Sequence, residues 1–177
     1  MPQHRPFRFG SEMLRANSAS DWLETARRVE AHGYSTLLMP DHFAPIYAPI
    51  AALTSAVMAT TSLREGTTVF ANDFRHPVVL AKEMATLDVL SEGRVEVGIG
   101  AGWKKAEYEQ AGIPFDDPSV RVERMTEAVQ ILKGLWRDEP FSFSGAHYSI
   151  VEMDGWPKPA QQPHPPIYVG AGAKRML

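Results

Sequence analysis

The alternation of short apolar runs with longer amphipathic runs constrains the fold of this sequence more than any other feature. Each amphipathic run opens on a capping residue or a proline, and two of them end at Gly33 and Gly93. A parallel βα protein has this rhythm, because each strand is followed by a helix that packs on the sheet. The pattern predicts strands at 7–9, 35–39, 66–71, 94–99 and 167–170, and helices at 20–32, from 49 onward, at 77–93 and at 119–136.

Apolar side chains recur at helical spacing in these helices, which indicates the faces that pack on the sheet. In the first helix they are Trp22, Ala26 and Val29. In the last they are Val122, Met125, Val129, Leu132 and Trp136, with Glu123 and Glu127 on the opposite face.

Two segments depart from the βα rhythm within what we expect to be a single domain over residues 1–177. The segments 141–143 and 148–151 flank Ser144-Gly145 and predict a small hairpin insertion at 141–151. The whole pattern gives five strands and slightly more than four helices. A closed (β/α)8 barrel needs eight strands and about 250 residues, whereas a doubly wound sheet can close its core with five or six strands. Length alone therefore favours the doubly wound sheet.

The composition narrows the class of protein. The chain has no cysteine, 18 Lys and Arg, 21 Asp and Glu, and a net charge of −3. Disulfides and thiolate metal sites are excluded, and the six histidines show no metal-ligand spacing, so we expect no metal. Basic residues are scattered and no apolar run approaches the roughly 20 residues of a membrane span, so neither nucleic acid nor a membrane is an expected partner. We expect a cytoplasmic protein that binds a small molecule.

Candidate site residues follow the predicted strands, at the sheet edge where ligands of parallel βα proteins bind. Asp41 and His42 follow one strand, and the imidazole of His42 could donate or accept a proton there; the alternative is a capping aspartate beside a structural histidine. Gly98-Ile99-Gly100-Ala101-Gly102 ends another strand and lets the backbone approach a phosphate or a ring, but it also suits a tight turn without a ligand. Arg75 is a candidate for binding an anion or for pairing with a carboxylate.

Taken together, the motifs from Asp41 to Gly172 resemble those of the bacterial luciferase-like oxidoreductases, particularly the branch that uses the deazaflavin coenzyme F420. The matching motifs occur in the family's order: Asp41-His42-Phe43, Gly66-Thr67-Thr68-Val69, Arg75-His76-Pro77, Leu87-Asp88-Val89-Leu90-Ser91-Glu92-Gly93-Arg94, Gly98-Ile99-Gly100-Ala101-Gly102-Trp103, Glu107-Tyr108, Gly112-Ile113-Pro114-Phe115, Pro157-Lys158-Pro159 and Pro165-Pro166-Ile167-Tyr168-Val169-Gly170.

The resemblance implies a (β/α)8 TIM barrel, of which this chain is expected to be the first five βα units, truncated after strand five. It also implies a bulge with a non-proline cis peptide at Thr68 and Val69, which supports the cofactor ring. The ring edge is implied to lie near Asp41 and His42, with the backbone of Gly100, Ala101, Gly102 and Trp103 beside it. The loop Gly170-Ala171-Gly172 is implied to hold the cofactor phosphate, since a helix N-terminus attracts anions.

Two departures bear on the reaction. The sugar-phosphate dehydrogenases of this group have an acidic proton donor where this chain has Trp103, and a tryptophan where it has Ile46. Sugar-phosphate oxidation is therefore not expected. His42 is the expected proton-handling residue, with Asp41 positioning it or the ring, while Glu107 and Tyr108 are expected to support the loop.

We thus expect a hydride-transferring oxidoreductase that uses F420, or alternatively FMN, on a small organic substrate, and that forms a homodimer. The rival interpretation is a truncated, inactive barrel fragment, or one that closes only by oligomerisation, because unpaired edge strands invite pairing. The interpretation as a compact nicotinamide-binding sheet is weakened because Trp103 occupies the position where the dinucleotide fingerprint requires its third glycine.

Overall fold

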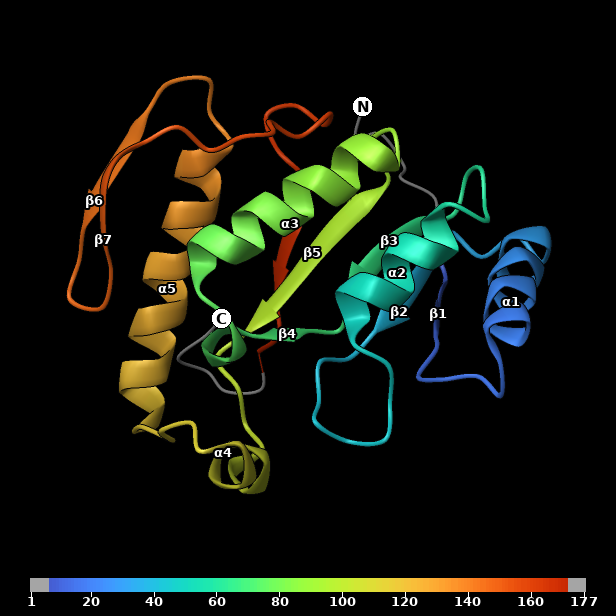
Figure 1. The fold of residues 1–177 in the computed structure, drawn as a ribbon, viewed down its shortest axis with the longest axis horizontal. Helices are drawn as coiled ribbons and strands as arrows, with labels where there is room; N and C mark the ends of the chain where they lie inside the picture. Colours follow the sequence, from blue (N-terminus) through green and yellow to red (C-terminus); the bar gives the residue numbers. More distant parts are fainter. Residues whose placement is uncertain (1–6, 172–177) are drawn as a thin grey trace.

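Consecutive βα units build the computed structural model, which describes residues 7–171 (Figure 1). The strands of the main sheet are β1 (Gly10–Glu12), β2 (Thr36–Met39), β3 (Arg64–Thr67), β4 (Phe70–Ala71), β5 (Val95–Gly100) and β8 (Ile167–Val169). Their order is β1-β2-β3-β5-β4, with β8 also pairing with β5, and every pairing is parallel. Neighbouring units therefore follow chain order, as they do around a barrel, whereas a doubly wound sheet reverses its order at a switch point. The doubly wound alternative favoured by length is wrong.

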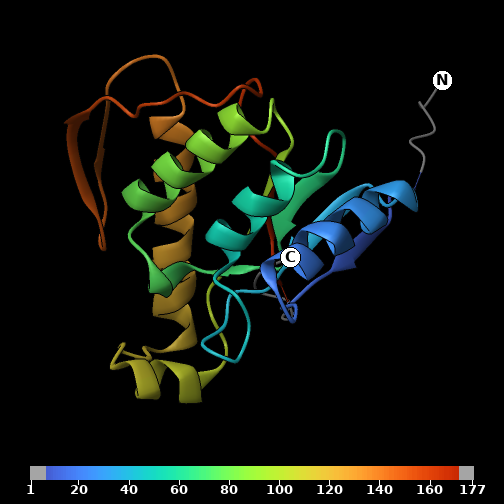
Figure 2. The ribbon, with the colours of Figure 1, turned by 45° about the vertical axis from the view of Figure 1, so that its right-hand side comes forward.

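Helices cover one side of this sheet, as Figures 1 and 2 show for α2 and α3, with α5 beside α3. The helices are α1 (Ala19–Ala31), α2 (Pro49–Val57), α3 (Pro77–Leu90), α4 (Lys105–Ala111) and α5 (Pro118–Leu135), with a 3-10 turn η1 (Asn72–Phe74). Prolines begin three of them, and the side chain of Ser18 caps α1 by accepting from the Asp21 amide at 3.1 Å. In the described part of the chain, none of the helices is both long and apolar enough to span a bilayer.

The core lies between the sheet and these helices. It is built from strand residues such as Leu37, Met39, Val97 and Ile99 and from helix residues that include the predicted stripe of α1. The indole nitrogen of Trp136 donates to the Ala81 carbonyl at 2.9 Å and so fixes the end of α5 against α3. The core fills the space between the sheet and the helices. It therefore does not cover the carboxyl ends of the strands, where a site can form.

Two predicted strands differ from the observed ones. The first strand is Gly10–Glu12 instead of 7–9, because Gly10 pairs with Thr36 of β2 while Phe7 and Phe9 are 89% and 70% exposed. The third is divided into β3 and β4, and the interruption is the cis peptide between Thr68 and Val69. The non-proline cis peptide that the family resemblance implied is thereby confirmed.

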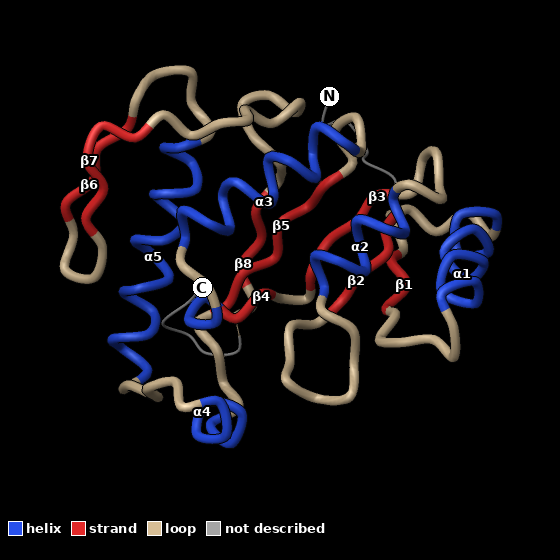
Figure 3. Tube along the Cα trace, viewed as in Figure 1, coloured by secondary structure: helices blue, strands red, loops and turns tan. Residues whose placement is uncertain are grey.

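The buried face of α5 is wider than the predicted stripe. Met125 and Leu132 are buried as expected, but Val122 and Val129 are only half-buried, while Ala128 and Ile131 are fully buried. The reason is that α5 contacts α3, η1 and the hairpin formed by β6 (Phe141–Ser144) and β7 (Ser149–Met153), which stands apart from the main sheet (Figure 3). The hairpin itself is where the sequence predicted it.

The hairpin turn is fixed by Glu127, which the sequence placed on the solvent face of α5. Its carboxylate accepts hydrogen bonds from the backbone amides of Ala146, His147 and Tyr148 at 2.7, 3.0 and 3.1 Å. Burial alone raises the pKa of Glu127, but these amides outweigh it and leave the pKa below its ordinary value. Glu127 is therefore a structural residue that joins the hairpin to the helix.

Replacing Glu127 by alanine is expected to speed amide hydrogen exchange at residues 146–148 by about tenfold or more, since a hydrogen bond to a charged group contributes about 1.5–3 kcal/mol. Glu123→Ala, on the exposed face of the same helix, is the matched control and should leave these amides unchanged. Equal exchange in both variants would show that the turn is held by its own backbone.

Candidate functional site

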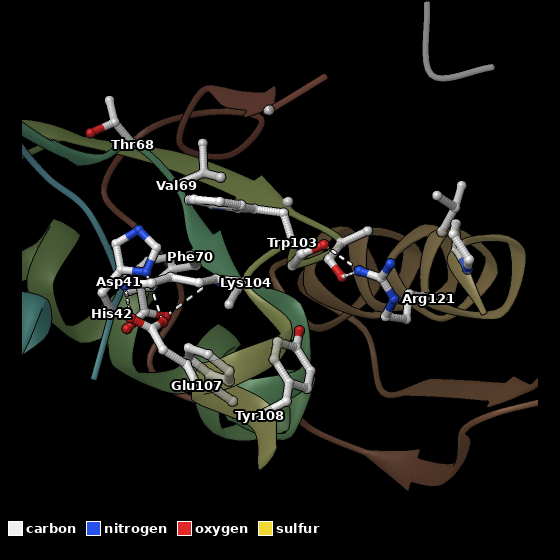
Figure 4. Close-up of a pocket in the computed structure, with 18 of the residues that line it drawn as sticks. Asp41, His42, Thr68, Val69, Phe70, Trp103, Lys104, Glu107, Tyr108 and Arg121 are labelled. Carbon is white, nitrogen blue, oxygen red and sulfur yellow. Dashed lines mark hydrogen bonds and ion pairs between the residues drawn. The ribbon is translucent and has the colours of Figure 1, made fainter. Parts of the chain in front are cut away.

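A cavity of about 620 Å³ opens at the carboxyl ends of β2, β4, β5 and β8 (Figure 4). Nine of the catalytic and cofactor-binding candidates from the sequence line it: Asp41, His42, Thr68, Val69, Gly100, Ala101, Gly102, Trp103 and Gly170. The remaining lining residues are Phe70, Ala71, Phe74, Lys104, Glu107, Tyr108, Pro118, Ser119, Arg121 and Val122. Ala171 is described but does not line the cavity, and Gly172 lies outside the described residues. Candidates far apart in the sequence are thus brought to one place.

Val69 and two glycines form one wall of this cavity. A Cβ at Gly100 would lie 2.7 Å from Val69 Cγ2, and one at Gly170 would lie 2.9 Å from the same methyl group. Both distances are shorter than ordinary Cβ contacts, so a side chain at either position would force Val69 or the backbone to shift. The result is a smooth apolar surface beside the Thr68–Val69 peptide.

The glycine turn is supported from two sides. Gly102 has a φ of +78°, and the space that a Cβ would need is filled by the hydroxyl of Tyr108. Arg121 of α5 donates to the carbonyl oxygens of Ala101 and Gly102 and to that of Asp116. Tyr108 therefore supports the loop as predicted. The sequence analysis missed Arg121, although an arginine in line with the buried Met125 and Leu132 of α5 was a signal that its charge meets a partner.

Asp41 serves the structure of the site. Its buried carboxylate accepts hydrogen bonds from Arg75 at 2.6 and 3.2 Å and from the Ala71 amide at 3.1 Å. These contacts join the end of β2 to β4 and to the start of α3. Of the two interpretations of Arg75, pairing with a carboxylate is confirmed. Asp41 does not position His42 among the described contacts, because its oxygens are engaged elsewhere.

The carboxylate that contacts His42 is Glu107. His42 Nδ1 lies 2.8 Å from Glu107 Oε2, and Lys104 Nζ donates to Glu107 Oε1, also at 2.8 Å (Figure 4). Burial alone raises the pKa of Glu107, but the hydrogen bonds and charges of Lys104 and His42 outweigh it, so the pKa lies below its ordinary value. The sequence analysis assigned Glu107 only to loop support, because nothing in the spacing of residues 42 and 107 showed that they meet.

Trp103 covers this pair. Its indole lies edge-on to the His42 ring, with ring centroids 5.9 Å apart and planes at 90°, and it extends below Val69 in Figure 4. The side chain is 73% exposed and forms an apolar wall at the mouth of the cavity.

Comparisons with known proteins identify the family of this chain. Residues 5–177 match the luciferase-like monooxygenase family. An F420-dependent glucose-6-phosphate dehydrogenase of Amycolatopsis mediterranei is 31% identical over 160 residues, covering 86% of this chain and 47% of the relative. An FMNH(2)-dependent dimethylsulfone monooxygenase of Pseudomonas putida is 37% identical over 98 residues, covering 55% of this chain and 27% of the relative.

Solved structures give the same result. An F420-dependent secondary alcohol dehydrogenase, in complex with an F420-acetone adduct, superposes with a TM-score of 0.79 and is 27% identical, covering 91% of this chain and 50% of that one. The chain spans about half the length of the curated relatives it matches. Its fold is that of a luciferase-like TIM barrel whose ring is not closed within the described residues. With a matched family over nearly its whole length, this chain belongs to the luciferase-like monooxygenases.

Proposed function

We propose that this chain carries the cofactor site of a hydride-transferring oxidoreductase that uses coenzyme F420, with FMN as the alternative cofactor. The observation that carries the proposal is the convergence of nine candidate residues on one cavity beside the Thr68–Val69 peptide. F420 is favoured over FMN because the F420-dependent relative named above matches 86% of this chain and the FMNH(2)-dependent one only 55%. The dimeric state expected from the sequence is part of the same proposal.

The residues present fit a flat cofactor ring. The volume of about 620 Å³ is in the range of about 300–1,000 Å³ typical of small-molecule sites. Val69 offers an apolar face for the ring, and the two adjoining glycines add no side chain that would obstruct it. Gly170, which lines the cavity, and the adjoining Ala171 are the proposed phosphate contact, and the helix implied after them lies outside the described residues.

In this proposal the bound cofactor supplies the carbon that takes or gives a hydride. The chain's own residues do the rest: His42 exchanges a proton with the substrate oxygen, Trp103 and Phe70 exclude water, and Asp41 with Arg75 fixes the cavity edge. The two cationic residues that line the cavity are already engaged, Lys104 by Glu107 and Arg121 by backbone carbonyls. The proposed substrate is therefore an uncharged alcohol or carbonyl compound, and we expect no oxidation of a sugar phosphate.

Titration with oxidised and reduced F420 and with FMN, followed by absorbance and fluorescence, tests the cofactor proposal, and light scattering on the same sample gives the mass in solution. We expect saturable binding of F420, and Gly100→Ala should weaken it about tenfold or more because the added methyl group overlaps Val69. Ala51→Val, exposed on α2, adds carbon far from the cavity and is the matched control. Binding of FMN alone would select the alternative, and binding of neither would refute the proposal.

A further inference from the structure

We propose that Glu107 is a positioning residue that sets which nitrogen of His42 carries the proton, and that Lys104 fixes Glu107 in that role. The inference rests on the proposed function and deepens it, because it names the group that prepares His42 for proton transfer. It is carried by three side chains in a row, with Lys104 Nζ and His42 Nδ1 each 2.8 Å from a different oxygen of one buried carboxylate.

Burial and charge make Glu107 suited to this role. Its side chain is 5% exposed, compared with 26% for His42 and 41% for Lys104, so the carboxylate lies beneath both partners. A buried carboxylate is stable as an ion only when it is paired and hydrogen-bonded, and Lys104 supplies that pairing from the solvent side. An ionised carboxylate can only accept hydrogen bonds. Nδ1 of His42 must therefore be the donor.

This arrangement leaves the other ring nitrogen of His42 free to accept a proton. When Nδ1 carries the hydrogen of the neutral ring, Nε2 has a lone pair, and Nε2 lies on the side of the ring away from Glu107 (Figure 4). If an alcohol were oxidised here, its hydroxyl proton would move to Nε2 and its hydride would be taken up by the bound cofactor, so that the C–O bond would become C=O. Glu107 stabilises the imidazolium that results and takes no proton itself, because Lys104 keeps it ionised.

The position of Glu107 is fixed by its helix. It lies in the first turn of α4, and the next residue, Tyr108, is buried under the turn at Gly102 with its hydroxyl 3.3 Å from Asp73 Oδ2. Lys104 stands three residues before Glu107, where a helix brings two side chains together. The carboxylate is thus held between the lysine at the N-cap of its helix and a histidine that follows β2.

Replacing Glu107 by glutamine makes a specific prediction. The oxygen of the new amide is expected to face the Lys104 ammonium, which can only donate, and its NH₂ group then faces His42 and donates to Nδ1. The proton of the neutral ring must therefore move to Nε2. The tautomer is read directly from nitrogen-15 NMR of the histidine ring in the full chain, with the signals of His42 assigned by their loss in His42→Asn.

We expect the unprotonated nitrogen of His42 to be Nε2 in the wild-type protein and Nδ1 in Glu107→Gln. The double variant Lys104→Met/Glu107→Gln should restore the wild-type tautomer, because the amide is then free to turn its oxygen toward His42. Glu109→Gln, which removes an exposed carboxylate paired with Lys105 on the same helix, is the matched control and should change nothing. A wild-type protein with the proton on Nε2, or a Glu107→Gln tautomer equal to the wild type, would overturn the proposal.

Activity gives the second readout. With 2-propanol and oxidised F420 as probes, Glu107→Gln should lower kcat about 10²–10⁴-fold, the contribution typical of a positioned general base, and leave the F420 dissociation constant within about threefold. The double variant should recover at least part of that loss. Absence of F420 binding and turnover in the wild type refutes the proposed function, whereas an unchanged tautomer refutes the role of Glu107, so the two failures are distinguishable.

Discussion

Replacing Glu65 by glutamine is expected to stabilise the folded protein by about 3 kcal/mol at pH 7, although Glu65 touches neither the cavity nor solvent. Glu65 lies in the middle of the sheet, with Leu37 of β2 and Val95 of β5 as its register partners. Neither carboxyl oxygen has a hydrogen-bond partner among the described residues. Burial raises the pKa of Glu65 to about 9, and the charge of Arg94 only partly offsets this.

Arg94 makes no hydrogen bond to Glu65, because the donors of its guanidinium group are bound to other residues. The guanidinium donates to the carbonyl oxygens of Ser91, Leu63 and Val57 and to the hydroxyl of Thr60, at 2.8–3.2 Å. The carboxyl group is thus held in its neutral form by the folded protein. The unfolded chain releases the same proton near the ordinary pKa of 4.5. Stability from this group is therefore fully present below about pH 4.5 and is lost as the pH rises towards about 9.

The stabilisation by Glu65→Gln should accordingly grow with pH. Urea unfolding followed by circular dichroism is expected to show little difference from wild type at pH 4.5 and a difference that increases steadily up to about pH 9. Glu65→Met removes the unpaired oxygens as well, so it should stabilise the protein at every pH. Glu123→Gln, exposed on α5, is the control, with an expected change within about 0.5 kcal/mol. A constant difference between wild type and Glu65→Gln would show that Glu65 is ionised in the folded state.

Local sequence signals were sufficient for most of the fold. Prolines at the helix starts, the Ser18 cap and the glycines after α1 and α3 are read from neighbouring residues, and the helices begin within a residue or two of where these signals placed them. The strand at 7–9 was misplaced because aromatic residues are typical of strands in general. Which residues pair is decided by the neighbouring strand, and β2 pairs with residues 10–12.

The site was predictable to the extent that it depends on position at a strand end. Asp41, His42 and the glycines follow strands directly, so the parallel topology alone brings them together. The contacts made by Glu107, Arg121 and Arg75 could not be predicted in the same way. They lie on helices or loops, and their partners are 65, 19 or 20, and 34 residues away in sequence. Such pairings depend on how helices pack, which no local pattern specifies.

Of these pairings, the ion pair between Arg75 and Asp41 is expected to be the strongest single contact of the site. Replacing Arg75 by methionine should lower the free energy of unfolding by about 3–5 kcal/mol, because it leaves the buried carboxylate of Asp41 with only the Ala71 amide as a partner. The guanidinium also lies 4.8 Å from the centre of the Phe70 ring, a contact worth about 0.5–1 kcal/mol. A loss of this size is a large part of the 5–15 kcal/mol that stabilises a typical domain.

A double-mutant cycle separates the ion pair from the loss of packing. Asp41→Asn removes the charge but keeps an oxygen for the Ala71 amide, so Arg75→Met/Asp41→Asn should be more stable than Arg75→Met alone. Arg27→Met, on the exposed face of α1, controls for the change of side chain. Urea unfolding gives the four free energies, and F420 titration of the same variants shows whether the cavity edge moves. If the double variant is no more stable than Arg75→Met, the carboxylate of Asp41 is not an unpaired buried charge, and the edge of the cavity is held by the packing of Arg75 on Phe70.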